Sequence, residues 1–454
     1  MGAFGRQIVG RLVIVVAVAI AALAMATSAA SAANELPRQW DPRKVAVNRE
    51  AGNTFLLRPG QILAGPGDAT DVQRVLTGWR QSEKRPFGVT VFTRAPQNPA
   101  DPAREVIDAL ARIRKATANR PQGPARVAPN HVFVGEAAAA ATNFNGEPRL
   151  QGGPGSSVRQ ASLPAALPMR TSDRGDGQGV RIAVLDTGMF DHEWLKGVQR
   201  APNSDDVWDV ERDGYGDAEA GHGTFIAGLI LQVAPAASVY AVKVLDSHGV
   251  GDDLGVADAI EKLPPDIDIV NLSLGGYTDR DAAPLALATA IRALGERRAV
   301  VAAAGNEGAG RPFWPAAFDR QVLAVGAVEQ GDGKWNRAGY SNHGPWVDAT
   351  ARGSNLQSTF SREKTLVAQG LTTNPATDPT IAFGGWASWD GTSFATPIAA
   401  AMIARTMSRN GLLSAAAAQS QLLASSPPAQ QPDFPHAVLL DELEGMPEPA
   451  MEVK

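Results

Sequence analysis

The pattern of hydrophobic residues changes along the chain, and the second half has the clearest signal. Continuous apolar runs rich in Val, Ile and Ala recur there. They are VRIAVLD (180–186), SVYAVKVLD (238–246), DIDIVNLSLG (266–275), RRAVVAAAGN (297–306) and QVLAVGAV (321–328). Such runs are typical of strands buried on both faces of a parallel sheet. They alternate with helix-like stretches at 224–233, 255–263 and 283–294. The alternation predicts a doubly wound α/β domain, a parallel sheet with flanking helices.

The region before residue 137 has shorter apolar runs, broken by polar and proline-rich segments. Residues 104–116 carry apolar side chains at helical spacing. The segments FGVTVFT (87–93) and NHVFVGE (130–136) have the pattern of strands. Together they predict a small α+β domain over residues 33–136.

Composition places the other boundaries. Residues 137–178 are rich in Ala, Gly, Ser and Pro, which is typical of a linker. The α/β domain is expected over 179–425. Residues 426–454 are proline-rich and then acidic, so we expect a C-terminal tail without a core of its own.

The first 32 residues have the parts of a secretory signal peptide. Arg6 and Arg11 give a basic start, residues 12–26 form an uncharged apolar run, and Ala30-Ser31-Ala32 supplies a small-residue cleavage site. The run is short for a membrane span, although an uncleaved anchor is the alternative. We expect export to the exterior or the cell envelope, with no stable membrane span after signal cleavage.

Charge and cysteine content exclude several classes of function. The 454 residues carry a net charge of -5, which gives no electrostatic basis for nucleic-acid binding. The chain has no cysteine, which excludes disulfides, cysteine-ligated zinc and a cysteine nucleophile.

Three of the predicted strands end in small and polar residues. These ends are Asp186-Thr187-Gly188, Ser273–Gly276 and Gly305–Gly308. Functional residues of doubly wound sheets gather just beyond the carboxyl ends of the strands, so we expect a site there. Taken singly, each feature has an ordinary structural interpretation, because Asp is common in turns and Ser in helix N-caps.

Four sequence blocks taken together favour catalysis. They are AVLDTG at Asp186, GHGTFIAGLI at His222, AAAGNEG at Asn306 and GTSFATPIAAA at Ser393. These blocks resemble the subtilisin-like serine proteases (subtilases, peptidase family S8), in the Asp, His, Ser chain order of that family. The resemblance extends over about residues 180–409.

The resemblance implies a role for each of the four residues. Ser393 would be the nucleophile, and His222 the base that takes its proton and later gives it to the leaving amine. Asp186 would hold the imidazole tautomer. Asn306 would donate its side-chain amide to the oxyanion, with the backbone N–H of Ser393 as the second donor.

The positions of Ser393 and Pro397 in the serine block also have a local physical explanation. A serine at a helix start lies among unpaired backbone N–H groups, which favour negative charge. Pro397 removes only the N–H that would have bonded the carbonyl of Ser393, so its cost within the helix is reduced. Thr392 has no role that the sequence assigns.

The resemblance further implies the walls of the pocket for the residue before the scissile bond (P1). One wall is the SLGG segment and the other is AAAG. The expected substrate-binding residues are Ser273, Leu274, Gly275, Gly276, Ala303, Ala304 and Gly305. These small and apolar residues suggest an apolar or unselective P1. Residues 244–255 resemble the segment that pairs with an extended substrate as an added strand.

Neighbouring residues leave two questions open. Asp252 and Asp253 could favour basic residues at P2 or P4, or could simply be solvated. The short loop after Asn306 leaves the pocket floor open to Arg311, Phe313 or Trp314.

The region 33–136 is interpreted as a pro-domain. The segment RVAPNHVFVGE, up to Glu136, weakly resembles the closing strand of the family's inhibitory propeptides. The alternative is an accessory domain that stays attached. Processing, if it occurs, is expected within the linker 137–178.

The resulting prediction is a secreted serine endopeptidase, made as a precursor and acting as a monomer on protein or peptide substrates. A catalytically silent subtilase-like binding protein is the alternative. An α/β-hydrolase esterase is disfavoured by the chain order and by the absence of a G-x-S-x-G motif at Ser393. No cofactor is expected, although the acidic run 205–217 could bind calcium. His192 is interpreted as structural, and Phe225, where many relatives have histidine, as a change in packing only.

Overall fold

The computed structural model describes residues 41, 43–84, 86–135, 159–160, 175–331, 333–366, 375–411 and 413–440. The predicted signal peptide and most of the predicted linker lie outside these ranges. No helix within them is long and apolar enough to cross a membrane.

The main domain is built on a sheet whose neighbouring strands are parallel, apart from one hairpin. In sheet order its strands are β21 (Val438–Leu440), β16 (Ala349–Arg352), β14 (Leu323–Gly331), β13 (Ala299–Ala303), β11 (Ile269–Leu272), β7 (Arg181–Asp186), β9 (Ser238–Lys243) and β8 (Gln199–Arg200). The hairpin strand β15 (Lys334–Arg337) pairs antiparallel with β14. The strands β7, β9, β11, β13 and β14 confirm the five predicted apolar runs.

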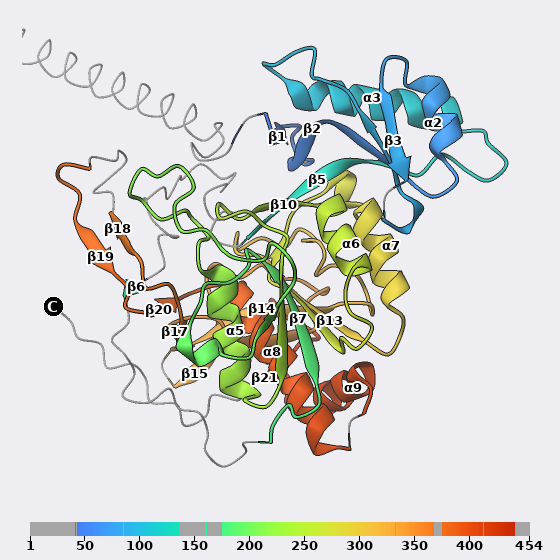
Figure 1. Cartoon of the computed structure of the whole chain (residues 1–454). Coiled ribbons are helices and arrows are strands. Elements are labelled where there is room, and N and C mark those ends of the chain that lie inside the picture. Colours follow the sequence, from blue (N-terminus) through green and yellow to red (C-terminus); the bar gives the residue numbers. More distant parts are fainter. Residues whose placement is uncertain are drawn as a thin grey trace, which may run out of the picture.

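Helices cover both faces of this sheet (Figure 1). On one face lie α5 (His222–Val233) and α8 (Thr392–Arg409), with α9 (Ala415–Ser425) packed against α8. On the other lie α6 (Asp253–Glu261) and α7 (Leu285–Leu294). Strand β7 shows why helices are needed on both faces. Its residues Ile182 and Val184 are buried with α5 and α8, whereas Ala183 and Leu185 are buried with α6 and α7. The predicted doubly wound α/β class is confirmed.

The order of the strands reverses beside β7. The chain passes from β7 outward to β9, and then returns to the other side through β11, β13 and β14. A crevice forms at such a switch point, outside the carboxyl ends of the strands. The ends of β7, β11 and β13 are therefore brought together at one edge.

The N-terminal region forms a small α+β domain. Its strands are β1 (Ala46–Asn48), β2 (Phe55–Ala64), β3 (Arg80–Lys84), β4 (Thr90–Thr93) and β5 (Val127–Gly135). Its helices are α2 (Ala69–Val75) and α3 (Pro102–Thr117). Asp101 caps α3 by accepting the N–H of Arg104, and Pro102 occupies the first helical position. The apolar face of α3 is buried against the sheet through Val106, Leu110 and Ile113.

Shorter elements complete the described chain. They are η1 (Pro86–Gly88), η2 (Glu193–Leu195), β10 (Val250–Asp252), β12 (Leu274–Gly275), η3 (Asp279–Asp281), β17 (Leu356–Thr359), β18 (Lys364–Leu366), β19 (Thr380–Ala382), β20 (Trp386–Trp389) and β6 (Arg159–Gln160). β6 pairs with β20, so a short piece of the predicted linker lies in a sheet.

The C-terminal boundary of the main domain differs from the prediction. Residues 426–440 pack on the domain, because β21 joins the main sheet beside β16 and Phe434 is buried there. Proline-rich composition suggested a tail, but proline does not prevent an irregular segment from packing on an existing core.

The two domains share a sheet. β5 pairs antiparallel with β2 inside the N-terminal domain, and with β10 and β12 of the main domain. Polar contacts surround this junction: Arg58 pairs with Asp252 at 2.7 Å, and Arg114 pairs with Asp279 at 2.7 Å. Figure 1 shows the N-terminal domain (blue to cyan) resting beside α6 and α7.

His131 lies buried in this junction. Its Nε2 accepts a hydrogen bond from the backbone N–H of Asp279 at 3.0 Å. Burial lowers the pKa of His131 to about 3, although the charge of Asp279 opposes the shift and that of Arg114 adds to it. The ring is therefore neutral when the domains are joined, whereas the exposed ring takes up a proton below about pH 6.5.

We expect the N-terminal domain to be held less tightly as the pH falls from about 6.5 toward 3. The separated state then binds a proton that the joined state does not, which costs about 1.4 kcal/mol per pH unit. The measurement is hydrogen exchange in β5 between pH 7.5 and 4.5, in a full chain carrying Ser393→Ala. His131→Gln should flatten the pH dependence and the exposed control His436→Gln should not. Equal slopes in all three chains would contradict the assignment to His131.

Candidate active site

Asp186 and His222 meet at the carboxyl edge of the main sheet. Asp186 is the last residue of β7, and His222 is the first of α5. Both side chains are buried, and His222 Nδ1 lies 2.9 and 3.0 Å from the two carboxylate oxygens of Asp186. Asp186 also accepts the backbone N–H of Thr187. With Nδ1 donating to Asp186, the neutral ring has Nε2 as the atom that can take a proton.

Two glycines let α5 begin this close to β7. Gly221 has a φ of 90°, and a Cβ added there would lie 2.5 Å from the ring of Phe360. A Cβ at Gly223 would lie 2.2 Å from the carbonyl oxygen of Gly188. The glycines on either side of His222 are therefore required by packing.

Ser393 lies at the start of α8 and is tied to Ser273, just beyond β11. Ser273 Oγ donates to the carbonyl oxygen of Ser393 at 2.7 Å, and Ser393 Oγ donates to the carbonyl oxygen of Ser273 at 3.2 Å. Pro397 cannot bond the carbonyl of Ser393, and the hydroxyl of Ser273 takes the place of the missing donor. The proline thus leaves no buried acceptor unsatisfied.

Asn306 and Thr392 link the end of β13 to the same helix start. The backbone N–H of Thr392 donates to Asn306 Oδ1 at 2.9 Å, and Thr392 Oγ1 accepts the N–H of Gly305 at 3.1 Å. Because Oδ1 is held by Thr392, the amide Nδ2 lies beside Gly391, where an added Cβ would be 3.2 Å from it. Thr392, which had no role from the sequence, orients the amide of Asn306.

The described residues contain no hydrogen bond between Ser393 and His222. His222 Nε2 has no hydrogen-bond partner there, and the nearest carboxylate to it is Glu219, at 3.6 Å. Catalytic hydrogen bonds are commonly loose without a reacting substrate, so this geometry is compatible with a nucleophile and base that engage later.

Carboxylates surround the imidazole. Burial favours the neutral form of His222, but the charges of Asp186 and Glu219, the hydrogen bond with Asp186 and the charge of Asp206 raise its pKa to about 9. Burial raises the pKa of Asp206 itself to about 6, with Lys243 opposing. His222 is therefore an imidazolium at neutral pH in this closed arrangement.

The two expected walls of the P1 pocket lie on adjacent elements beside Ser393. Leu274 and Gly275 form β12, and Ala303 ends β13, followed by Ala304 and Gly305. All seven of the predicted wall residues are buried. An added Cβ at Gly275 would lie 2.2 Å from Phe313, so this ring packs directly beneath the first wall.

The other pocket-floor candidates have separate contacts. Arg311 pairs with Asp281 at 2.6 Å, and donates to the carbonyl of Thr54 in the N-terminal domain at 2.6 Å. The backbone of Trp314 exchanges hydrogen bonds with Gly276. Arg311 is thus engaged at the domain junction.

The two aspartates considered for P2 or P4 have structural partners. Asp253 is fully buried and accepts the N–H groups of Ala286 and Leu287 at the start of α7. Asp252 caps α6 and pairs with Arg58 of the N-terminal domain. Asp253 therefore does not face a substrate.

Strand β5 occupies the position expected for an extended substrate. Gly135 is opposite Leu274 and Val134 is opposite Gly275, while Val250 lies across from Val134 on the other side. The N–H of Gly135 donates to the carbonyl of Gly249 at 2.8 Å. The end of β5 is thus held between β10 and β12, beside the segment that contacts Ser393.

Aromatic rings pack against His222. Trp389 and Phe394 lie 5.4 and 5.2 Å from the imidazole, between ring centroids. Phe225 packs against both rings. The predicted packing role of Phe225 agrees with these contacts. His192 bonds Gly385 and the N–H of Trp194, as a structural residue would.

One group of described side chains could hold a metal. Glu211, Asp217 and His248 each bring a ligand atom within 4.8 Å of the others. Glu211 already pairs with His248 at 2.9 Å, and Asp217 accepts from Ser247. These two acids belong to the acidic run considered for calcium, and the calcium prediction stays a prediction.

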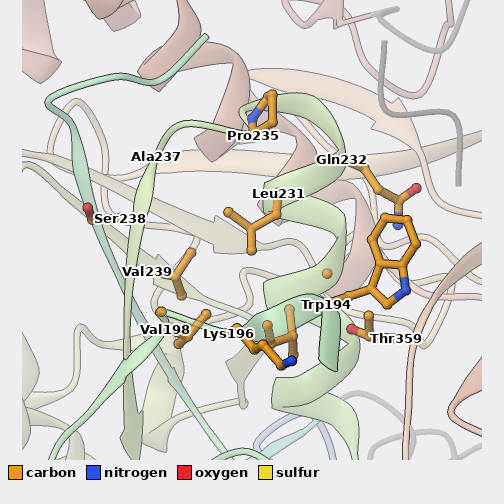
Figure 2. Close-up of a pocket in the computed structure, with 13 residues that line it drawn as sticks. Trp194, Lys196, Val198, Leu231, Gln232, Pro235, Ala237, Ser238, Val239 and Thr359 are labelled. Atoms are coloured by element: carbon orange, nitrogen blue, oxygen red, sulfur yellow. The ribbon is translucent and has the colours of Figure 1, made fainter. Parts of the chain in front are cut away.

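The pocket in Figure 2 lies apart from this site. Its volume is about 260 Å³, and it is lined by residues of η2, the second half of α5 and the start of β9. The start of a parallel strand is at the opposite edge of the sheet from Asp186, so this pocket contains none of the four predicted catalytic residues.

Three functional features escaped the sequence analysis. Glu219 lies against His222, Ser273 bonds the Ser393 backbone, and Thr392 orients Asn306. For Glu219, the only signal in the sequence was its position three residues before His222. That position does not indicate whether its side chain points toward the imidazole.

Comparisons with known proteins identify the family and the fold. A family model described as the subtilase family matches residues 177–438. Alkaline elastase YaB of Bacillus sp. (strain YaB) is 33% identical over 258 residues, covering 54% of this chain and 58% of the elastase. M-protease of Shouchella clausii (strain KSM-K16) is 34% identical over 248 residues, covering 52% of this chain and 55% of that protein. The alignments therefore span little more than half of these two relatives.

Other relatives are covered more fully. Subtilisin Savinase of Lederbergia lenta is 34% identical over 248 residues, covering 52% of this chain and 78% of that protein. Among solved structures, fervidolysin from Fervidobacterium pennivorans, a keratinolytic enzyme related to subtilisin, superposes with a TM-score of 0.57 at 18% identity. The match covers 92% of this chain and 65% of fervidolysin, and it shows the same fold. With a family match over more than half of its length, the chain belongs to the subtilase family of serine-type endopeptidases.

Proposed function

We propose that this protein is a secreted serine endopeptidase that hydrolyses peptide bonds through an acyl-enzyme and is made as a self-processing precursor. The observation that carries the proposal is the convergence of Asp186, His222 and Ser393 at one edge of the sheet, next to a strand in substrate register. Export rests on the N-terminal sequence.

The residues divide the chemistry among them. Ser393 Oγ attacks the substrate carbonyl while His222 Nε2 takes its proton, and His222 then protonates the leaving amine. Asp186 stabilises the imidazolium through Nδ1. Asn306 Nδ2 and the backbone N–H of Ser393 donate to the oxyanion, where charge develops in the transition state. Water then releases the acyl group by the same steps in reverse.

The N-terminal domain acts as a pro-domain in this proposal. Gly135, the last described residue of β5, is opposite Leu274, and the adjacent Ser273 accepts a hydrogen bond from Ser393 Oγ through its carbonyl. We therefore propose the bond shortly after Gly135, Glu136–Ala137 at the start of the predicted linker, as the cleavage site. In protease nomenclature Glu136 is P1 and Gly135 is P2.

We expect Ser393 to react with a fluorophosphonate and the chain to be cut after Glu136. The full chain without residues 1–32 is incubated and then read by mass and N-terminal sequencing. Ser393→Ala should stay long and unlabelled, while Ser420→Ala, an exposed serine on α9, should behave as the wild type. A folded wild type that is neither labelled nor cut would favour the catalytically silent binding protein.

Removal of the oxyanion donor should slow catalysis strongly. Asn306→Ala should lower kcat by about 10²–10³-fold, the effect of losing one such donor in subtilisin. The rate is measured on the peptide VFVGEAAA, taken from residues 132–139 of this chain, with the exposed amide variant Asn336→Ala as control. A loss under about threefold would indicate that Asn306 only holds Thr392.

A further inference from the structure

Glu219 is a carboxylic acid in the active site that the proposed mechanism does not use. It is fully buried, and its Oε2 lies 3.6 Å from His222 Nε2. Asp186 contacts the other nitrogen of the same ring, so the imidazole lies between two acids. Glu219 thus faces the nitrogen that must take the proton of Ser393.

Glu219 also lies between two glycines, Gly135 of β5 and Gly249 of the loop before β10. A Cβ added at Gly135 would lie 2.9 Å from both Cδ and Oε2 of Glu219, and its three nearest atoms all belong to Glu219. A Cβ at Gly249 would lie 2.4 Å from Glu219 Cγ. The side chain therefore fills the space between β5 and the loop before β10.

Gly135 does not need to be glycine for its own backbone. Its φ is outside the left-handed region, whereas Gly249 has a φ of 78°. An alanine at 135 would keep the backbone and collide only with the end of the Glu219 side chain. The absence of a side chain at this position is thus explained by Glu219 alone.

We propose that Glu219 is the residue that selects the P2 position of substrates, favouring glycine there. The inference rests on the proposed function, because it takes β5 as the model of a bound substrate. A P2 side chain and the Glu219 side chain compete for the same space beside His222. Glycine leaves Glu219 in place, and any larger residue has to displace it.

Displacement is unfavourable because of where Glu219 lies. Its backbone N–H donates to the carbonyl oxygen of Ser247, and its side chain is fully buried between Gly135 and Gly249. Moving the carboxyl group away also removes it from the charged ring of His222. A P2 side chain larger than glycine would overpack this space. We expect such a substrate to lose about 10–100-fold in kcat/KM relative to one with glycine at P2.

The contact between Glu219 and His222 also links the residue at P2 to the pH dependence of activity. The charged groups that face His222 are Asp186 from β7, Asp206 and Glu219, with Lys243 next to Asp206. A base must be neutral to act, so activity is lost as the pH falls through the pKa of His222. Each carboxylate raises that pKa and moves the acid limb upward.

The test compares P2 residues on the processed enzyme. The peptides are VFVXEAAA, with Gly, Ala, Leu or Lys at X, and kcat/KM is measured across pH 6–11. The wild type should prefer Gly by about tenfold or more. Glu219→Ala should remove the preference, while Glu296→Ala, an exposed acid on the main domain, should keep it. Glu219→Gln should move the acid limb down by about one pH unit on the Gly peptide.

A second measurement does not depend on catalysis. In the full chain carrying Ser393→Ala, Gly135→Ala should lower Tm, and this loss should shrink when Glu219→Ala is added. If the wild type cleaves no peptide, the proposed function fails and this double-mutant cycle still decides whether Glu219 excludes a side chain at 135.

Four results would overturn the inference. The first is a wild type with equal kcat/KM for Gly and Leu at P2, and the second is a Gly preference that persists in Glu219→Ala. The third is a Gly135→Ala penalty on Tm that is the same with and without Glu219. A P2 preference for Lys over Gly would also overturn it, since Glu219 would then act as an ion-pair partner and not as a barrier.

Discussion

The buried contact between Asp186 and His222 is the constraint around which the rest of the site is arranged. Removing two ionisable groups from water is unfavourable unless each is paired and hydrogen-bonded. The contact at 2.9 Å supplies the pairing, and the N–H of Thr187 supplies a further donor. α5 has to begin directly at the end of β7 for this to happen, which explains the two glycines beside His222. The aromatic rings of Trp389 and Phe394 then close the imidazole from water.

The proposed nucleophile is positioned by a different set of contacts. Ser393 is joined to the end of β11 by paired hydrogen bonds with Ser273, and its helix is joined to the end of β13 through Thr392 and Asn306. Both strands belong to the parallel sheet, which is buried on its two faces and resists deformation. The interior proline of α8 fits this scheme, because it frees the carbonyl that Ser273 bonds. Nucleophile and oxyanion donor are thereby positioned relative to the same sheet.

The N-terminal domain completes the structure by adding a strand to the main domain. β5 pairs with β2 of the N-terminal domain and with β10 and β12 of the main domain, so the same strand stabilises its own domain and links the two domains. Charged contacts such as Arg58 with Asp252 lie around this strand, His131 is a buried residue of the strand itself, and the buried Glu219 lies next to its last residue, Gly135. Glu219, whose side chain lies next to Gly135 of β5, is one of the carboxylates that raise the pKa of His222, whereas burial lowers it.

The sequence by itself determined the fold class and the family. Buried parallel strands leave continuous apolar runs, which are a local signal. The proposed catalytic residues lie in short blocks such as GHGT and GTSFATP, whose order along the chain is characteristic of the family. Only the tertiary structure decided how distant segments meet. It shows that Ser273 bonds the carbonyl of Ser393 that Pro397 leaves free, and that residues 426–440 join the main domain. It also shows that the side chain of Glu219 lies next to Gly135 and points toward His222. These contacts join residues far apart in the chain or depend on which way one side chain points. Contacts of these kinds leave no local sequence pattern. The conformational propensity of an acid or a proline is the same whichever distant residue it contacts.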